Sequence, residues 1–144
     1  MSEGCVDASL IVKLALKGEA HRAKAHKFVK DCGENGTIMI APPIFESELD
    51  GIIRRRVFEG KLTPDKARLA YCVLDGTPVQ IITHSSLRKR AREIAEQFNQ
   101  RLVYDSTYAA LAELRSCEFW TADKAFYDSV KLALPLVKYL INYQ

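Results

Sequence analysis

The chain alternates between short apolar runs and longer segments in which apolar residues recur every three or four positions. Short apolar runs bounded by polar or turn residues are typical of buried strands, and the helical spacing is typical of amphipathic helices. Strands are therefore predicted at Gly4–Val6, Thr37–Ala41, Val79–Ile82, Glu118–Thr121 and Pro135–Leu140. Helices are predicted at about Ala8–Leu16, Glu19–Cys32, Ile44–Phe58, Pro64–Leu74, His84–Gln97, Tyr104–Leu114 and Asp123–Leu132. In the fifth of these, His84-Ser85-Ser86 is the predicted capping segment.

This order of elements predicts an α/β fold in which a mostly parallel sheet of about five strands has helices on both faces. The chain has 144 residues and no repeats, linkers or low-complexity tracts, so one domain over residues 1–144 is expected. Open sheets of this kind place their functional sites beyond the carboxyl ends of the strands.

Composition and charge narrow the function only slightly. The net charge of +3 is too small to indicate a nucleic-acid partner unless the basic residues cluster. The four cysteines are widely spaced and form no zinc-binding pattern with the three histidines, so free thiols in a reducing cytoplasm are expected. No secretory signal is expected, because Asp7 interrupts the first apolar run. No membrane-spanning segment is expected either, because no apolar stretch is near the roughly 20 residues that a spanning helix needs.

Four acidic residues lie at or near the junctions between predicted strands and helices. Asp7 and Asp123 follow strands directly, Asp105 opens a helix, and Glu48 lies in the second turn of another. If the strands are parallel neighbours, these carboxylates converge at one edge of the sheet. Such a group suits a hard divalent cation, with which it could activate a water for attack on a phosphodiester.

Each acid also has a simpler interpretation. Asp105 and Asp123 could only cap their helices, and Glu48 could be a surface acid near a helix start. Asp7 is harder to explain in this way, because an acid that ends a buried strand needs a partner. Ser9 could add a hydroxyl beside the metal or could simply help to start a helix.

Two basic clusters are candidates for contact with RNA phosphates, although a solvated helix face is the commoner meaning of such runs. The candidate contact residues are Arg54, Arg55, Arg88, Lys89 and Arg92. Tyr104 and Tyr108 flank Asp105 and could either stack on an unpaired base or pack in the core.

Four segments, taken together and in order, resemble the PIN-domain ribonucleases, and most closely the VapC-type toxins of toxin–antitoxin pairs. These segments are Val6-Asp7-Ala8-Ser9, Ala41-Pro42 with Glu48-Leu49, Tyr104-Asp105 with Tyr108 and Ala112-Glu113, and Thr121-Ala122-Asp123. The resemblance implies an α/β/α fold and an endoribonuclease that uses Mg²⁺ or Mn²⁺ to cleave single-stranded regions of RNA.

The resemblance also assigns the metal-binding and catalytic quartet to Asp7, Glu48, Asp105 and Asp123, with Ser9 beside it. It implies a homodimer formed through helices such as Pro64–Leu74, an antitoxin that blocks the acidic groove, and products with 5′-phosphate and 3′-hydroxyl ends. Gly51 departs from the family pattern, which commonly has asparagine three residues after the glutamate.

Other functions stay open at this point. A housekeeping RNA-processing PIN nuclease would use the same residues, and a catalytically inactive RNA- or protein-binding module would keep only the fold. A phosphoacceptor receiver domain also gathers acids at a sheet edge, but Ile82-Thr83 stands where its acceptor aspartate would be. The chain contains neither the G-x-G-x-x-G motif of dinucleotide-binding domains nor the P-loop motif of nucleotide-triphosphate-binding domains.

Overall fold

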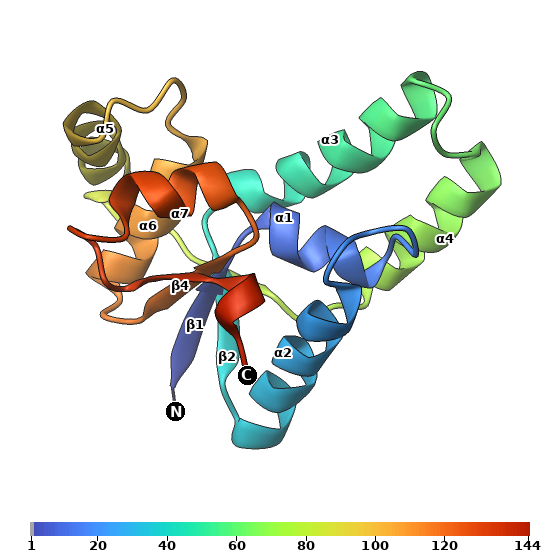
Figure 1. The fold of residues 1–144 in the computed structure, drawn as a ribbon, viewed down its shortest axis with the longest axis horizontal. Coiled ribbons are helices and arrows are strands. Elements are labelled where there is room, and N and C mark those ends of the chain that lie inside the picture. The colour runs from blue at the N-terminus through green and yellow to red at the C-terminus, as the bar shows by residue number, and fades with distance from the viewer. Residues whose placement is uncertain (1) are drawn as a thin grey trace.

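A computed structural model describes residues 2–144 and shows a five-stranded parallel sheet in the order β3-β2-β1-β4-β5 (Figure 1). The strands are β1 (Glu3–Val6), β2 (Ile38–Ala41), β3 (Gln80–Ile81), β4 (Glu118–Thr121) and β5 (Val137–Tyr139). The α-helices are α1 (Ala8–Ile11), α2 (Arg22–Asn35), α3 (Ile44–Phe58), α4 (Pro64–Asp75), α5 (Leu87–Gln97), α6 (Tyr104–Leu114) and α7 (Lys124–Val130). Two 3-10 helices, η1 (Val12–Leu14) and η2 (Leu140–Asn142), complete the fold.

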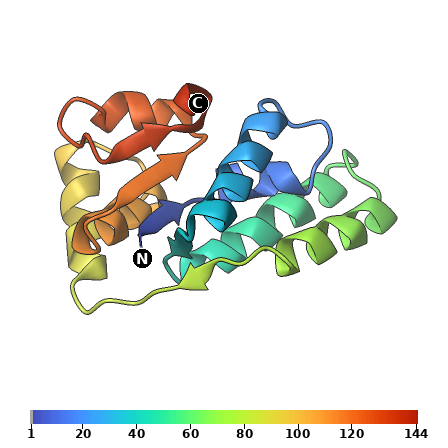
Figure 2. The same cartoon turned by 90° about the horizontal axis from the view of Figure 1, so that it is seen from below.

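Strand β1 lies at the centre of the sheet and pairs in parallel with β2 and β4. Figures 1 and 2 show α5, α6 and α7 gathered on one side and α2 on the other, while α3 and α4 form a hairpin that projects from the sheet. Helix α6 packs on β1 and β4, whereas α2 packs on β2. The predicted α/β fold with a parallel sheet and helices on both faces is confirmed.

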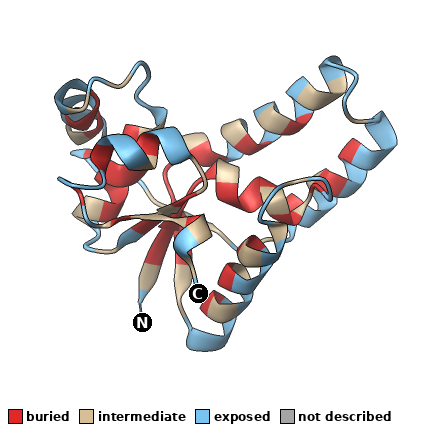
Figure 3. Ribbon diagram, viewed as in Figure 1, coloured by how far each residue is buried: buried red, intermediate tan, exposed pale blue. Residues whose placement is uncertain are grey.

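The core lies where these helices meet the central strands, and the outer faces of α4 and α5 are exposed (Figure 3). Phe119 on β4 contributes a fully buried ring that stacks on Tyr108 of α6, with ring centroids 5.5 Å apart. On the other side, Trp120 and Tyr143 pack around Phe28 of α2. The core therefore fixes α6 firmly against the strands that end at the candidate site.

Several predicted boundaries are confirmed, including those of α3, α6 and β4. Others differ because side-chain contacts decide where helices end. The predicted helix Ala8–Leu16 is only one α-helical turn followed by η1, where Arg22 binds the carbonyl oxygens of Lys13 and Leu14. The predicted helix Glu19–Cys32 instead begins at Arg22 and continues to Asn35, where it ends at Gly36, whose φ of +70° favours glycine.

None of the helices within residues 2–144 is long and apolar enough to cross a membrane. The predicted domain 1–144 begins with one residue that lies outside the described part of the chain.

Candidate functional site

The four predicted acids line one cleft of about 460 Å³ at the carboxyl ends of the central strands. They reach it from four parts of the chain: Asp7 and Asp123 lie just after β1 and β4, Glu48 lies in the second turn of α3, and Asp105 lies in the first turn of α6. The other residues that line this acidic cleft are Ala8, Ser9, Ile52, Arg55, Gln100, Arg101, Leu102, Tyr104 and Tyr108. The structure thus brings together all four acids that the sequence singled out.

Asp7 lies at the floor of the acidic cleft and is only 2% exposed. One carboxylate oxygen accepts hydrogen bonds from the Ser9 hydroxyl at 2.7 Å and from the backbone N–H of Leu10 at 3.0 Å, so Asp7 caps α1. The other oxygen accepts a bond of 2.5 Å from the Thr121 hydroxyl. Burial raises the pKa of Asp7 to about 6, and the two hydroxyl groups limit the rise by favouring the charged form.

Glu48 is half-buried and accepts a 2.7 Å hydrogen bond from the phenol of Tyr108. Burial raises the pKa of Glu48, and this hydrogen bond opposes the rise. The interpretation of Glu48 as a surface acid is therefore wrong. Its neighbours Glu46 and Asp50 are exposed, as expected for residues two positions away on a helix.

Asp105 sits in the first turn of α6, one residue inside the helix, and Val103 occupies the capping position. The interpretation of Asp105 as a helix cap is therefore wrong. Burial and the negative charges of Asp7, Asp123 and Glu48 raise the pKa of Asp105 to about 8. A carboxyl group held in this way is poised to lose its proton when a cation arrives.

Asp123 both caps a helix and faces the acidic cleft. One of its carboxylate oxygens accepts a 3.0 Å hydrogen bond from the backbone N–H of Phe126, which caps α7. Its own N–H donates to the Thr121 hydroxyl at 3.0 Å, so the same hydroxyl contacts both Asp7 and Asp123. Ser9 also receives the N–H of Ala122 at 3.2 Å, which joins the segments after β1 and β4.

The donor set of the acidic cleft fits a hard divalent cation. It consists of carboxylate oxygens, which Mg²⁺ and Mn²⁺ prefer, and the pKa of Asp105 is raised by burial and by neighbouring negative charges that a cation would offset. No three histidine, cysteine, aspartate or glutamate side chains within residues 2–144 already stand in the geometry of a finished metal site. A cation would thus draw in carboxylates that now bind hydroxyl groups, such as Glu48 on Tyr108.

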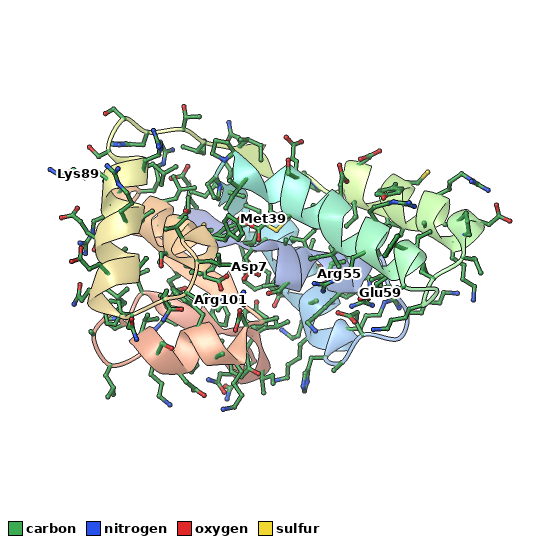
Figure 4. All side chains as sticks on the ribbon, turned by 90° about the horizontal axis from the view of Figure 1, so that it is seen from above. Asp7, Met39, Arg55, Glu59, Lys89 and Arg101 are labelled. Carbon is green, nitrogen blue, oxygen red and sulfur yellow. The ribbon has the colours of Figure 1, made fainter. Side chains whose placement is uncertain are left out.

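Of the predicted RNA-contact residues, only Arg55 lines the acidic cleft. The other predicted contacts, Arg54, Arg88, Lys89 and Arg92, are exposed but lie outside its walls. In Figure 4 Lys89 lies at the far edge of α5, whereas Arg55 and Arg101 flank Asp7.

Three site residues took their importance only from the structure. Arg101 precedes α6 in a loop and had no pattern to mark it. Thr121 was part of a recognised segment, but its bridging role depends on the pairing of β1 with β4. Tyr108 is 1% exposed and stacks on Phe119, so packing in the core is the correct interpretation of this tyrosine, whereas Tyr104 is exposed at the rim.

Comparisons with known proteins agree with this geometry. The PIN-domain family matches residues 4–131 of the chain. PAE2754 from Pyrobaculum aerophilum has a similar crystal structure, with 19% identity and a TM-score of 0.68 over 97% of this chain and 92% of that one. Comparison with curated proteins finds no match.

Two further crystal structures are similar. VapC20 of Mycobacterium tuberculosis, described as a sarcin–ricin loop cleaving toxin, has 18% identity and a TM-score of 0.65 over 88% of this chain and 94% of that one. VapBC2 from Rickettsia felis, bound to a DNA fragment from its promoter, has 12% identity and a TM-score of 0.65 over 95% of this chain and 98% of that one. At these identities the likeness shows a shared fold.

Proposed function

The chain belongs to the PIN-domain family, and on that premise we propose that it is an endoribonuclease that depends on Mg²⁺ or Mn²⁺ and cuts single-stranded regions of RNA. The observation that carries this proposal is the gathering of four carboxylates, from four separate elements, in one cleft at the carboxyl edge of the sheet. A fold-only binding module would have no need to maintain the burial and the neighbouring negative charges that raise the pKa of Asp105.

Asp7 and Asp105 would hold the cation chiefly, and Glu48 and Asp123 would bind it directly or through water. The bound cation would supply an activated water and neutralise negative charge on the phosphate oxygens. The protein's own part is to place these groups. The Thr121 and Ser9 hydroxyls hold the carboxylate of Asp7 in one orientation.

The other side chains that line the acidic cleft would position Glu48 and the RNA substrate. Tyr108 holds the side chain of Glu48, and Arg55 and Arg101 stand on opposite sides of Asp7 where they can bind RNA phosphates. Tyr104 at the rim offers an exposed ring for an unpaired base. The products expected are a 5′-phosphate and a 3′-hydroxyl.

The similarity of the fold to VapC20 and VapBC2 supports a role as the toxin of a toxin–antitoxin pair. The protein would then arrest growth when expressed alone, and an antitoxin encoded beside it would bind and silence the acidic cleft. Growth arrest that requires Asp105 and is relieved by the product of the adjacent small gene would support this role. Normal growth with active nuclease in the cell would instead indicate an RNA-processing enzyme.

The nuclease itself is tested by cleavage of an end-labelled single-stranded RNA with Mn²⁺, in parallel with EDTA and with the Asp105→Asn protein. Cleavage that is lost in both controls is the expected result. Absence of cleavage by the folded, antitoxin-free protein, on tRNA and ribosomal RNA as well, would contradict the proposal. Cleavage that survives the substitution would show that the site is wrongly placed or that another ribonuclease contaminates the sample.

A further inference from the structure

A second and larger cleft, of about 710 Å³, adjoins the acidic cleft. It lies between the segment after η1, the last turns of α3 and the start of α4, and we refer to it as the basic cleft. Its charged lining consists of Lys17, Arg55, Arg56, Lys61, Lys66 and Glu59. Five cationic side chains against one carboxylate make this cleft suited to a polyanion.

The cations of the basic cleft differ in whether they already have partners. Arg56 pairs with Glu19 at 3.0 Å, and Lys61 pairs with Glu59 at 3.4 Å. Lys17, Arg55 and Lys66 are exposed, and none of them forms an ion pair with any residue in the described range 2–144. These three positive charges are therefore available to a ligand.

The two clefts are joined by one side chain. Arg55 lines both of them, and Figure 4 shows it on α3 between Asp7 and Glu59, which lines the basic cleft. A strand with a phosphate in the acidic cleft would leave past Arg55 and enter the basic cleft.

We propose that the basic cleft binds the phosphate backbone of a single RNA strand beyond the scissile bond, with Lys17, Arg55 and Lys66 as the contacts. This inference rests on the proposed nuclease function and adds to it a substrate-binding site that requires an RNA longer than the acidic cleft alone can hold. Phosphate contacts of this kind add affinity without reading sequence.

The occupant that competes with RNA is an acidic peptide. Continuity with the acidic cleft favours RNA, because a phosphodiester there places its neighbouring phosphates at Arg55. The wall also carries apolar side chains, of which Leu69 is exposed, so the choice of RNA rests on this continuity and on the three cations without ion-pair partners.

The test compares Lys17→Gln/Lys66→Gln with a matched control, Lys30→Gln/Lys138→Gln, which removes two lysines outside both clefts. Both pairs are placed in the Asp105→Asn protein, and binding of labelled RNAs of about 20 and about 5 nucleotides is measured against salt. We expect the cleft pair to weaken binding of the long RNA by about tenfold and to lower its salt slope by about 1.4. The control pair should follow the parent protein.

In the active protein, the ratio of kcat/KM for the long RNA to kcat/KM for the short RNA should fall with the cleft pair and not with the control pair. An unchanged ratio, with metal-dependent cleavage intact, would overturn this inference and leave the nuclease standing. Absence of cleavage in every protein would instead count against the nuclease. Binding of poly-glutamate that is lost in the cleft pair while RNA binding is kept would assign the basic cleft to an acidic peptide and overturn the inference.

Discussion

The phenol of Tyr108 donates a 2.7 Å hydrogen bond to the carboxylate of Glu48, which lies 60 residues earlier in the chain. The ring behind this hydroxyl is buried against Phe119, so Tyr108 cannot move without disturbing the core. One carboxylate of the acidic cleft is thereby fixed to the centre of the protein. Glu48 sits near the start of α3, the helix whose far end carries Arg55 and the basic cleft.

Removal of the Tyr108 hydroxyl should impair metal binding and cleavage more than it lowers the stability of the fold. We expect Tyr108→Phe to lower the free energy of unfolding by about 1 kcal/mol and to lower nuclease activity or metal affinity by about tenfold. Thermal unfolding measures the change in stability, and the Mn²⁺ dependence of cleavage measures the change in activity and metal affinity. Tyr104→Phe is the control, because the Tyr104 hydroxyl makes no hydrogen bond within residues 2–144. Equal effects of the two substitutions would contradict the role given to Tyr108.

Asp105→Asn should separate activity from stability. Asparagine keeps the shape but removes a charge that the neighbouring acids oppose, so activity should fall by about 100-fold or more. Without metal at pH 8 the variant should be more stable than the natural protein by about 1 kcal/mol. Chemical denaturation in EDTA measures this difference. An unfolded variant would show that Asp105 has an indispensable structural role.

The metal-free protein should become less stable as the pH rises from about 4 to about 8. The pKa values of Asp7 and Asp105 are raised to about 6 and about 8 in the folded state, so the folded state holds protons that the unfolded chain has already lost. Their stabilising effect is complete below the unfolded pKa and disappears as the pH passes the folded pKa. Urea unfolding in EDTA across this range is the measurement.

The same linkage predicts a pH-dependent effect of metal. Mn²⁺ binds the deprotonated carboxylates, so it should raise the melting temperature more at pH 8 than at pH 5. Asp105→Asn should reduce this difference, since one of the titrating carboxyl groups is gone. A metal effect of the same size at both pH values would contradict the assignment of the metal to these acids.

Two fully buried hydroxyls should behave in opposite ways. The Ser106 hydroxyl is the buried side-chain oxygen or nitrogen without a hydrogen-bond partner among residues 2–144, whereas the Thr121 hydroxyl bonds to Asp7 and to the N–H of Asp123. We expect Ser106→Ala to be neutral or to stabilise the fold by up to about 1 kcal/mol. Thr121→Val should destabilise it by about 1–3 kcal/mol at pH 8, where Asp7 is charged. Denaturation midpoints of the two variants decide the comparison.

The homodimer expected through the helix after Thr63 stays a prediction. Val73 on α4 is 44% exposed and lies outside the basic cleft. If this face of α4 packs against a second copy, Val73→Asp should convert a dimer into a monomer in light scattering without lowering the melting temperature of the monomer. Val73→Thr is the shape-matched control. A natural protein that is monomeric at every concentration would contradict the predicted dimer.

The sequence by itself determined the elements and the chemistry available to them. Apolar runs and helix signals located β4, α3 and α6, and Thr63-Pro64 gave the start of α4, because these depend on local backbone preference and burial. The four acids could be selected because each stands at a junction between elements, and parallel strands bring such junctions to one edge.

Tertiary structure decided which side chains serve those acids. The bridge from Thr121 to Asp7 needs β1 and β4 side by side, and the bond from Tyr108 to Glu48 needs the first turns of α6 to lie within hydrogen-bond reach of the first turns of α3. Position in space also selected Arg55 over the basic run on α5, which the sequence had favoured equally, and added Arg101, which the sequence had not marked. A run of charged residues on a helix can face any side of the molecule until the helix is packed. The ends of parallel strands, by contrast, always lie at one edge of the sheet.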